Sequence, residues 1–70
     1  MYVFYKEDNS HNEVYVVHIL NGKVVTTKNV GEALSFKTAA EAYRFGGALA
    51  PLLDWWHVGD LQNGRTKKAG

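Results

Sequence analysis

One dipeptide, Asn21-Gly22, constrains this chain more than any other sequence feature, because it lies between two runs of strand-forming residues. The run before it, 13–20, reads Glu-Val-Tyr-Val-Val-His-Ile-Leu, and the run after it, 23–28, reads Lys-Val-Val-Thr-Thr-Lys. A two-residue type I′ turn needs positive φ at both central residues, and Asn-Gly adopts that conformation readily. The sequence therefore predicts an antiparallel hairpin that turns at Asn21-Gly22.

Two further strands and a loop are expected around this hairpin. Tyr2–Lys6 is rich in aromatic and β-branched residues, which are typical of a short strand. The six polar residues 7–12 predict a loop between the first and second strands. The segment 55–60, Trp-Trp-His-Val-Gly-Asp, predicts the last strand, and 29–36 is expected to be an irregular connection.

A helix is predicted over 39–50, because Thr38 and Glu41 form a capping box and Pro51 ends the helical pattern. Its apolar stripe is expected at positions i, i+3 and i+7 of one helix face. Two adjacent glycines, 46 and 47, lie inside this helix, where each costs about 1 kcal/mol. They indicate either a close approach of the helix to the sheet or a local kink. The stripe residues are Ala42, Phe45 and Leu49.

The element order β-β-β-α-β predicts an α+β fold, a small antiparallel sheet with one helix packed on one face. A chain of 70 residues is expected to form a single domain with a small core. We place that domain at residues 1–62. The polar and basic segment 63–70 is expected to be a flexible tail.

The second strand is apolar on both of its faces. Tyr15, Val17 and Ile19 alternate with Val14, Val16, His18 and Leu20. A single helix covers only one face of a sheet, and an antiparallel sheet with one wet face usually alternates cleanly. The surplus apolar face must therefore be covered by loop residues, by a second copy of the chain or by a foreign partner.

Five side chains are the candidate anchors for such a partner. Trp55 and Trp56 are adjacent, so on a strand they point to opposite faces, and one of them is available for an interface. Tyrosines on the uncovered face are further candidate interface residues, although Tyr rings are also common as half-buried side chains on the surface of small domains. The candidate set is Tyr5, Tyr15, Arg44, Trp55 and Trp56, with Arg44 as a polar contact on the exposed side of the helix.

Catalytic and metal-binding patterns are weak in this sequence. The three histidines, His11, His18 and His57, match no zinc-binding spacing, and the chain has no cysteine. His18 and His57 could meet across strands, but a histidine on a strand is more often structural or exposed. Ser10 and Ser35 lie in no nucleophile motif, and no phosphate-binding glycine loop is present. We therefore expect no catalytic residue, no cofactor, no metal and no enzymatic activity.

The charge of the chain bears on its partners. Eight Lys and Arg against seven Asp and Glu give a net charge of +1, which disfavours both a strongly basic nucleic-acid binder and an acidic DNA mimic. Exposed aromatics on a small sheet, with the basic residues Arg65, Lys67 and Lys68, keep single-stranded nucleic-acid binding as the alternative. Neither a transmembrane run nor a signal peptide is visible, so we expect no membrane contact and a cytoplasmic location.

The run Phe36-Lys37-Thr38-Ala39-Ala40-Glu41-Ala42-Tyr43 follows the predicted hairpin and precedes the Trp-rich closing strand. In this arrangement, over residues 2–61, the cysteine-free chain resembles the small accessory proteins of bacteriophages and other mobile elements, which include anti-CRISPR and host-takeover proteins. These proteins share no motif, so no functional residue is carried over. The resemblance implies an inhibitor or modulator that covers a functional surface of a protein complex in the cytoplasm of a bacterial host.

The sequence thus favours a non-enzymatic protein-binding module. A homodimer that buries the same sheet face is the close variant, and a single-stranded nucleic-acid binder is the alternative from another class.

Overall fold

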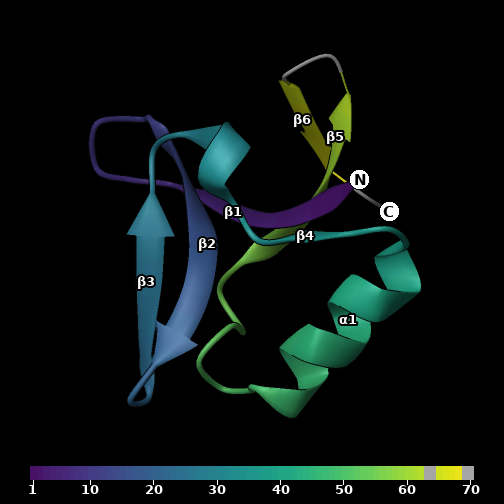
Figure 1. Cartoon of the computed structure of the whole chain (residues 1–70). Coiled ribbons are helices and arrows are strands. Elements are labelled where there is room, and N and C mark those ends of the chain that lie inside the picture. The colour runs from purple at the N-terminus through teal and green to yellow at the C-terminus, as the bar shows by residue number, and fades with distance from the viewer. Residues whose placement is uncertain (63–64, 69–70) are drawn as a thin grey trace.

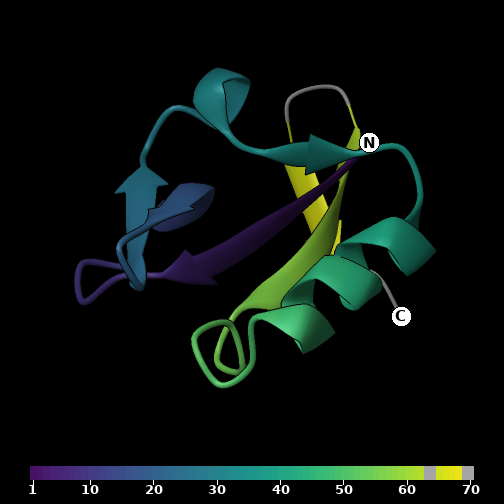
Figure 2. The same ribbon diagram turned by 60° about the horizontal axis from the view of Figure 1, so that its bottom comes forward.

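The strands form one sheet, and α1 (Ala39–Ala48) packs against its β1, β4 and β5 strands (Figures 1 and 2). The structure is a computed structural model, and it describes residues 1–62 and 65–68. The strand order is β3-β2-β1-β5-β6, with antiparallel neighbours, and β4 pairs with the beginning of β1. The strands are β1 (Tyr2–Glu7), β2 (Glu13–Leu20), β3 (Lys23–Thr27), β4 (Ser35–Phe36), β5 (His57–Gln62) and β6 (Arg65–Lys68).

The predicted α+β fold is confirmed, because an antiparallel sheet carries one helix on one face. The last predicted strand, β5, pairs with β1, with Val58 opposite Phe4 and His57 opposite Tyr5. This pairing makes β1 a central strand of the sheet. β5 begins at His57, so the expectation that Trp55 and Trp56 lie on the strand is wrong, and both belong to the preceding turn.

The two strongest local predictions are confirmed. Asn21 and Gly22 have φ values of 51° and 74°, as the predicted turn of the β2–β3 hairpin requires. The Thr38 hydroxyl accepts a hydrogen bond from the Glu41 backbone N–H at 3.2 Å and so caps α1. The helix ends at Ala48, two residues before the predicted end.

Three short elements lie where the sequence predicted none. The connection 29–36 contains a turn of 3-10 helix, η1 (Val30–Glu32), and the strand β4. The segment expected to be a flexible tail contains β6, which pairs with β5 through Leu61 and Thr66. The rest of that predicted tail, 63–64 and 69–70, lies outside the described residues.

A β-bulge in β2 explains why this strand has apolar residues at both odd and even positions. Val16 pairs with Thr26 and His18 pairs with Val25, so Val17 is the extra residue. The bulge reverses the alternation, and Val16 and Ile19 therefore both pack in the core, whereas His18 is exposed. The apolar surplus of β2 is thus smaller than strict alternation suggested.

The core lies between the sheet and α1. Phe4 is its centre: its ring packs edge-on against Phe36, with centroids 5.9 Å apart, and at 6.0 Å from the Phe45 ring. The predicted helix stripe, Ala42, Phe45 and Leu49, is part of this core. The buried members of the core are Phe4, Val16, Ala42, Leu53 and Val58.

The opposite face of the sheet, which we call the concave face, is covered by the curvature of the sheet itself. Thr66 on β6 donates a hydrogen bond to Glu13 on β2 at 2.8 Å, although β1 and β5 lie between these strands. Strands three spacings apart in a flat sheet are about 14 Å apart, so the sheet must curl to bring them together. Val3 and Tyr15 on this face are consequently only 0% and 6% exposed.

Candidate functional site

A groove of about 330 Å³ lies between the C-terminal half of α1 and the turn that leads into β5. In Figure 1, this turn connects the lower end of α1 to the lower end of β5. The floor of the groove consists of core residues, and its rim carries polar and aromatic side chains. The lining residues are Phe4, Tyr43, Gly46, Gly47, Leu53, Asp54, Trp56, His57 and Val58.

The helix wall of the groove follows from the spacing of three residues. Tyr43, Gly46 and Gly47 stand at i, i+3 and i+4, so they share one face of α1. A Cβ on Gly46 would lie 3.1 Å from Phe4 Cζ, so this glycine allows the predicted close approach of helix and sheet. A Cβ on Gly47 would meet no atom within 4 Å outside its own helix segment. Packing therefore explains Gly46 but not Gly47.

The other wall of the groove is a compact turn with hydrogen bonds of its own. The Asp54 N–H donates to the Pro51 carbonyl at 3.2 Å, and the Trp56 N–H donates to the Leu53 carbonyl at 3.1 Å. Leu53 is buried in the core and anchors this turn. Between these fixed points Trp55 is 85% exposed, the largest exposed fraction among the exposed large hydrophobic residues of the described chain.

The two adjacent tryptophans have different environments. Trp56 is half-buried against the core, and its ring lies 4.7 Å from the Lys6 ammonium nitrogen, measured to the ring centroid. This is a cation–π contact. Trp55 is on the surface. The structure thus assigns Trp56 to the core and leaves Trp55 as the exposed member of the pair.

The other predicted anchors are not part of the groove. Tyr15 is buried on the concave face and its hydroxyl donates to Glu13 Oε2 at 2.8 Å, so its prediction as an exposed anchor is wrong. Tyr5 is half-buried on the same face, where its ring lies 5.6 Å from the His57 ring and covers Gly59. Arg44 is exposed on α1, as predicted, but does not line the groove.

Two tyrosines of the concave face have raised pKa values. Burial raises the pKa of Tyr15 to about 12, and its hydrogen bond to Glu13 and the charge of Glu13 act in the same direction. Burial also raises the pKa of Tyr5, with smaller contributions from the charges of Glu13 and Glu7. Both phenols are therefore neutral at physiological pH. The Glu13 carboxylate links strands β2 and β6 through its hydrogen bond from Thr66.

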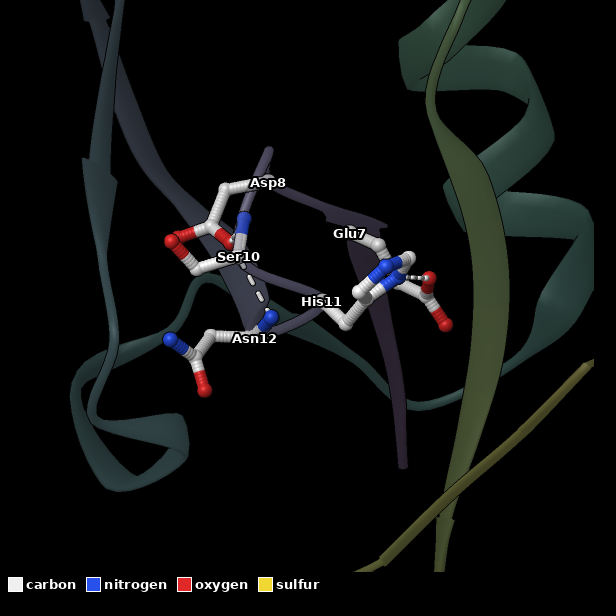
Figure 3. A network of polar contacts seen from close by, with 5 residues as sticks. All are labelled: Glu7, Asp8, Ser10, His11 and Asn12. Carbon is white, nitrogen blue, oxygen red and sulfur yellow. Dashed lines mark hydrogen bonds and ion pairs between the residues drawn. The ribbon is translucent and has the colours of Figure 1, made fainter.

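The β1–β2 loop is a closed network of polar contacts (Figure 3). The Asp8 carboxylate accepts hydrogen bonds from the backbone N–H groups of Ser10 and Asn12 at 2.9 and 3.0 Å. These two bonds lower the pKa of Asp8. His11 has a φ of 63°, and its ring nitrogen lies 3.5 Å from Glu7 Oε2. The polar groups of this loop bind one another, so we place no site here.

The histidines are distributed over separate places. His18 is exposed on β2 opposite Val25, and β1 separates β2 from the β5 strand that carries His57. Within residues 1–62 and 65–68, no group of three or more His, Asp or Glu side chains is arranged to hold a metal ion. No helix in the same part of the chain has the length and apolar character needed to cross a bilayer.

Comparisons of the chain with protein-family models, curated proteins and solved structures gave no match.

Sequence reasoning identified both tryptophans and the glycine pair but did not bring them together. The groove also needs the side chains of Tyr43 and Asp54, which come from α1 and the turn. The signal that could have found it is the second glycine, because one close approach requires only one residue without a side chain. In the structure the contact with Phe4 explains Gly46, so Gly47 is the glycine that packing does not explain, and it lines the groove.

Proposed function

We propose that this chain is a non-enzymatic protein-binding module and that its binding surface is Trp55 with the adjacent groove. The observation that carries this proposal is the 85% exposure of Trp55 on a turn that is anchored in the core. Tryptophan is among the residues most enriched at the energetic centres of protein interfaces. A large indole left in water on a small domain is therefore best explained by a partner that covers it.

The backbone around Trp55 supports this role. The two hydrogen bonds of the turn and the buried Leu53 fix the segment before any partner binds. Binding then orders little more than the indole side chain, which keeps the entropic cost of association low. Tyr43 and Leu52 are also exposed: Tyr43 lines the groove, and Leu52 belongs to the same turn as Trp55.

The mode of action that we propose follows the resemblance to phage accessory proteins. The module inhibits or modulates a host protein complex by covering one of its functional surfaces, in the cytoplasm of a bacterial host. The net charge of +1 supports contact with a protein surface over imitation of DNA. Homodimerisation and single-stranded nucleic-acid binding are the two alternative outcomes of the test below.

The test is site-specific photo-crosslinking with a benzophenone amino acid at position 55 and, in a matched control, at position 20. Leu20 is also an exposed apolar residue, 57% exposed, but it lies on β2 outside the groove. In a bacterial lysate we expect a discrete protein adduct from position 55 only. Excess unlabelled wild-type chain should compete for that adduct, whereas the Trp55→Ala chain should not.

Other results would contradict the proposal. An adduct of twice the chain mass assigns the surface to a homodimer, and an adduct lost on nuclease treatment assigns it to nucleic acid. Equal adducts from positions 55 and 20, or none from position 55, would remove the argument from Trp55 altogether.

A further inference from the structure

We infer that the groove receives a cationic side chain, arginine or lysine, from the protein partner. This inference rests on the proposed function and names the chemistry that the groove recognises. Three observations carry it: the missing side chain at Gly47, the negative charge at one end of the groove, and the aromatic side chains on its walls.

Gly47 keeps the helix wall of the groove open. A glycine inside a helix costs about 1 kcal/mol relative to alanine, and a Cβ at this position would meet no atom within 4 Å outside its own helix segment. Neither packing nor the turn of the chain requires it, because the helix continues to Ala48. A side chain here would project from the wall of the groove, so its absence preserves the space.

The groove is negative where α1 ends. Asp54 is exposed and contributes a carboxylate to the lining. The carbonyl end of a helix carries a partial negative charge, and the last turn of α1 contains no basic residue to offset it. Lys6 holds its positive charge over the Trp56 ring but is not one of the lining residues, so the charge of the lining itself favours a cationic ligand at the Asp54 end.

The aromatic lining suits the long aliphatic stem and charged end of arginine or lysine. Tyr43 supplies an aromatic ring to the lining, whereas the Trp56 ring already carries the Lys6 ammonium at 4.7 Å from its centroid. His57 is also in the lining, but its ring lies against Tyr5 on the concave face. A volume of about 330 Å³ lies at the lower end of the range for ligand pockets, about 300–1,000 Å³, which fits one long side chain.

The test uses the ¹⁵N-labelled full chain and four acetyl-Gly-X-Gly-amide peptides, with arginine, lysine, norleucine or glutamate at X. The arginine and lysine peptides should give saturable shifts of the Gly46 and Gly47 amide signals and of the Trp56 indole N–H signal. The norleucine peptide, which has a similar stem and no charge, should bind about five- to tenfold more weakly. The glutamate peptide should give no saturable shift.

Two variants test separately the negative charge of Asp54 and the open space at Gly47. Asp54→Asn should reduce the preference for arginine over norleucine, whereas Glu32→Gln, which removes an exposed acid on η1, should leave it unchanged. Gly47→Leu should abolish the saturable shifts of the arginine, lysine and norleucine peptides. A Cβ at this position would meet no atom within 4 Å outside its own helix segment, so we expect the chain to stay folded. The spectrum of each variant reports directly whether the fold is retained.

Two results would overturn the inference. Equal binding of the arginine and norleucine peptides would show that the groove has no charge preference, and an absence of saturable shifts would show that it takes no such side chain. Neither result removes the proposed function, because the photo-crosslink at position 55 tests protein binding independently. Conversely, a partner crosslinked at 55 that leaves the groove signals unshifted would limit the interface to Trp55.

Discussion

Gly59 is the position where adding a single carbon atom should be most damaging to this fold. A Cβ on Gly59 would lie 2.6 Å from Tyr5 Cε1 and 2.7 Å from Cδ1, with Thr66 Cβ at 3.3 Å beside it. Carbon atoms in contact prefer about 3.5–4.0 Å, so the ring of Tyr5 must move by about 1 Å. The ring cannot move without disturbing its contact with His57 and its cover of the concave face.

We expect Gly59→Ala to destabilise the domain by about 1–3 kcal/mol, the usual cost of overpacking a filled site. Without this clash the same change would stabilise a strand, because glycine in a strand interior costs about 0.5–1 kcal/mol relative to alanine. The sign of the change in unfolding free energy therefore shows whether the clash with Tyr5 is present. In urea unfolding followed by tryptophan fluorescence, the midpoint should fall by about 1 M, given slopes of about 1–3 kcal/mol/M.

A double-mutant cycle identifies the cause. In a Tyr5→Ala background the ring is absent, so Gly59→Ala should be neutral or stabilising, and the two changes should couple by about 1 kcal/mol or more. Gly47→Ala is the matched control, because the same substitution in open space should stabilise α1 by about 1 kcal/mol. A Gly59→Ala chain as stable as the wild type, or an equal loss in both backgrounds, would refute the packing described for the concave face.

Four further predictions follow from single side chains. Thr38→Ala should cost about 1 kcal/mol in thermal unfolding, because it removes the acceptor that caps α1, and Thr38→Ser should restore most of the loss. In an NMR titration, Asp8 should show a pKa below the usual carboxyl range. Its stabilising effect should be present above about pH 4 and be lost as pH falls through the lowered pKa. Asp8→Asn should remove this acid dependence of stability. The pH dependence of stability expected from Tyr15 has the opposite sign. Its pKa is about 10 in the unfolded chain and about 12 in the folded chain, so stability should fall as pH rises between these values. Tyr15→Phe should flatten this fall. Trp55→Ala should change the unfolding free energy by less than about 0.5 kcal/mol, because the indole is exposed; a larger loss would place Trp55 in the fold.

The features that could be predicted from the sequence depend on neighbouring residues. The turn at Asn21-Gly22 and the cap at Thr38 need only a few adjacent residues, and both were predicted correctly. The bulge at Val17 depends on how β2 meets β3, so alternation alone placed Ile19 on the wrong face. The apparent surplus of apolar surface came partly from that error.

The candidate site was harder to predict because distant parts of the chain form it. Trp55 and Trp56 lie in a turn, since the pairing of His57 with Tyr5 decides where β5 begins. Tyr15 was expected at the surface, but the curl of the sheet buries it, and that curl involves a hydrogen bond between residues 53 positions apart. Strand β6 has little apolar character, so its composition suggested a tail, whereas its backbone pairs with β5.

The central position of β1 also has a kinetic consequence. Tyr2 pairs with Asp60, so the middle of the sheet cannot form until nearly the whole described chain has been brought together. The β1–β2, β2–β3 and β5–β6 hairpins and α1 can form from local contacts, but the loop between β1 and β5 must close before the core exists. Such non-local pairing places a domain among the slower small folders, at milliseconds to seconds rather than microseconds. The chain therefore folds as one cooperative unit, and no contiguous half of it contains the core.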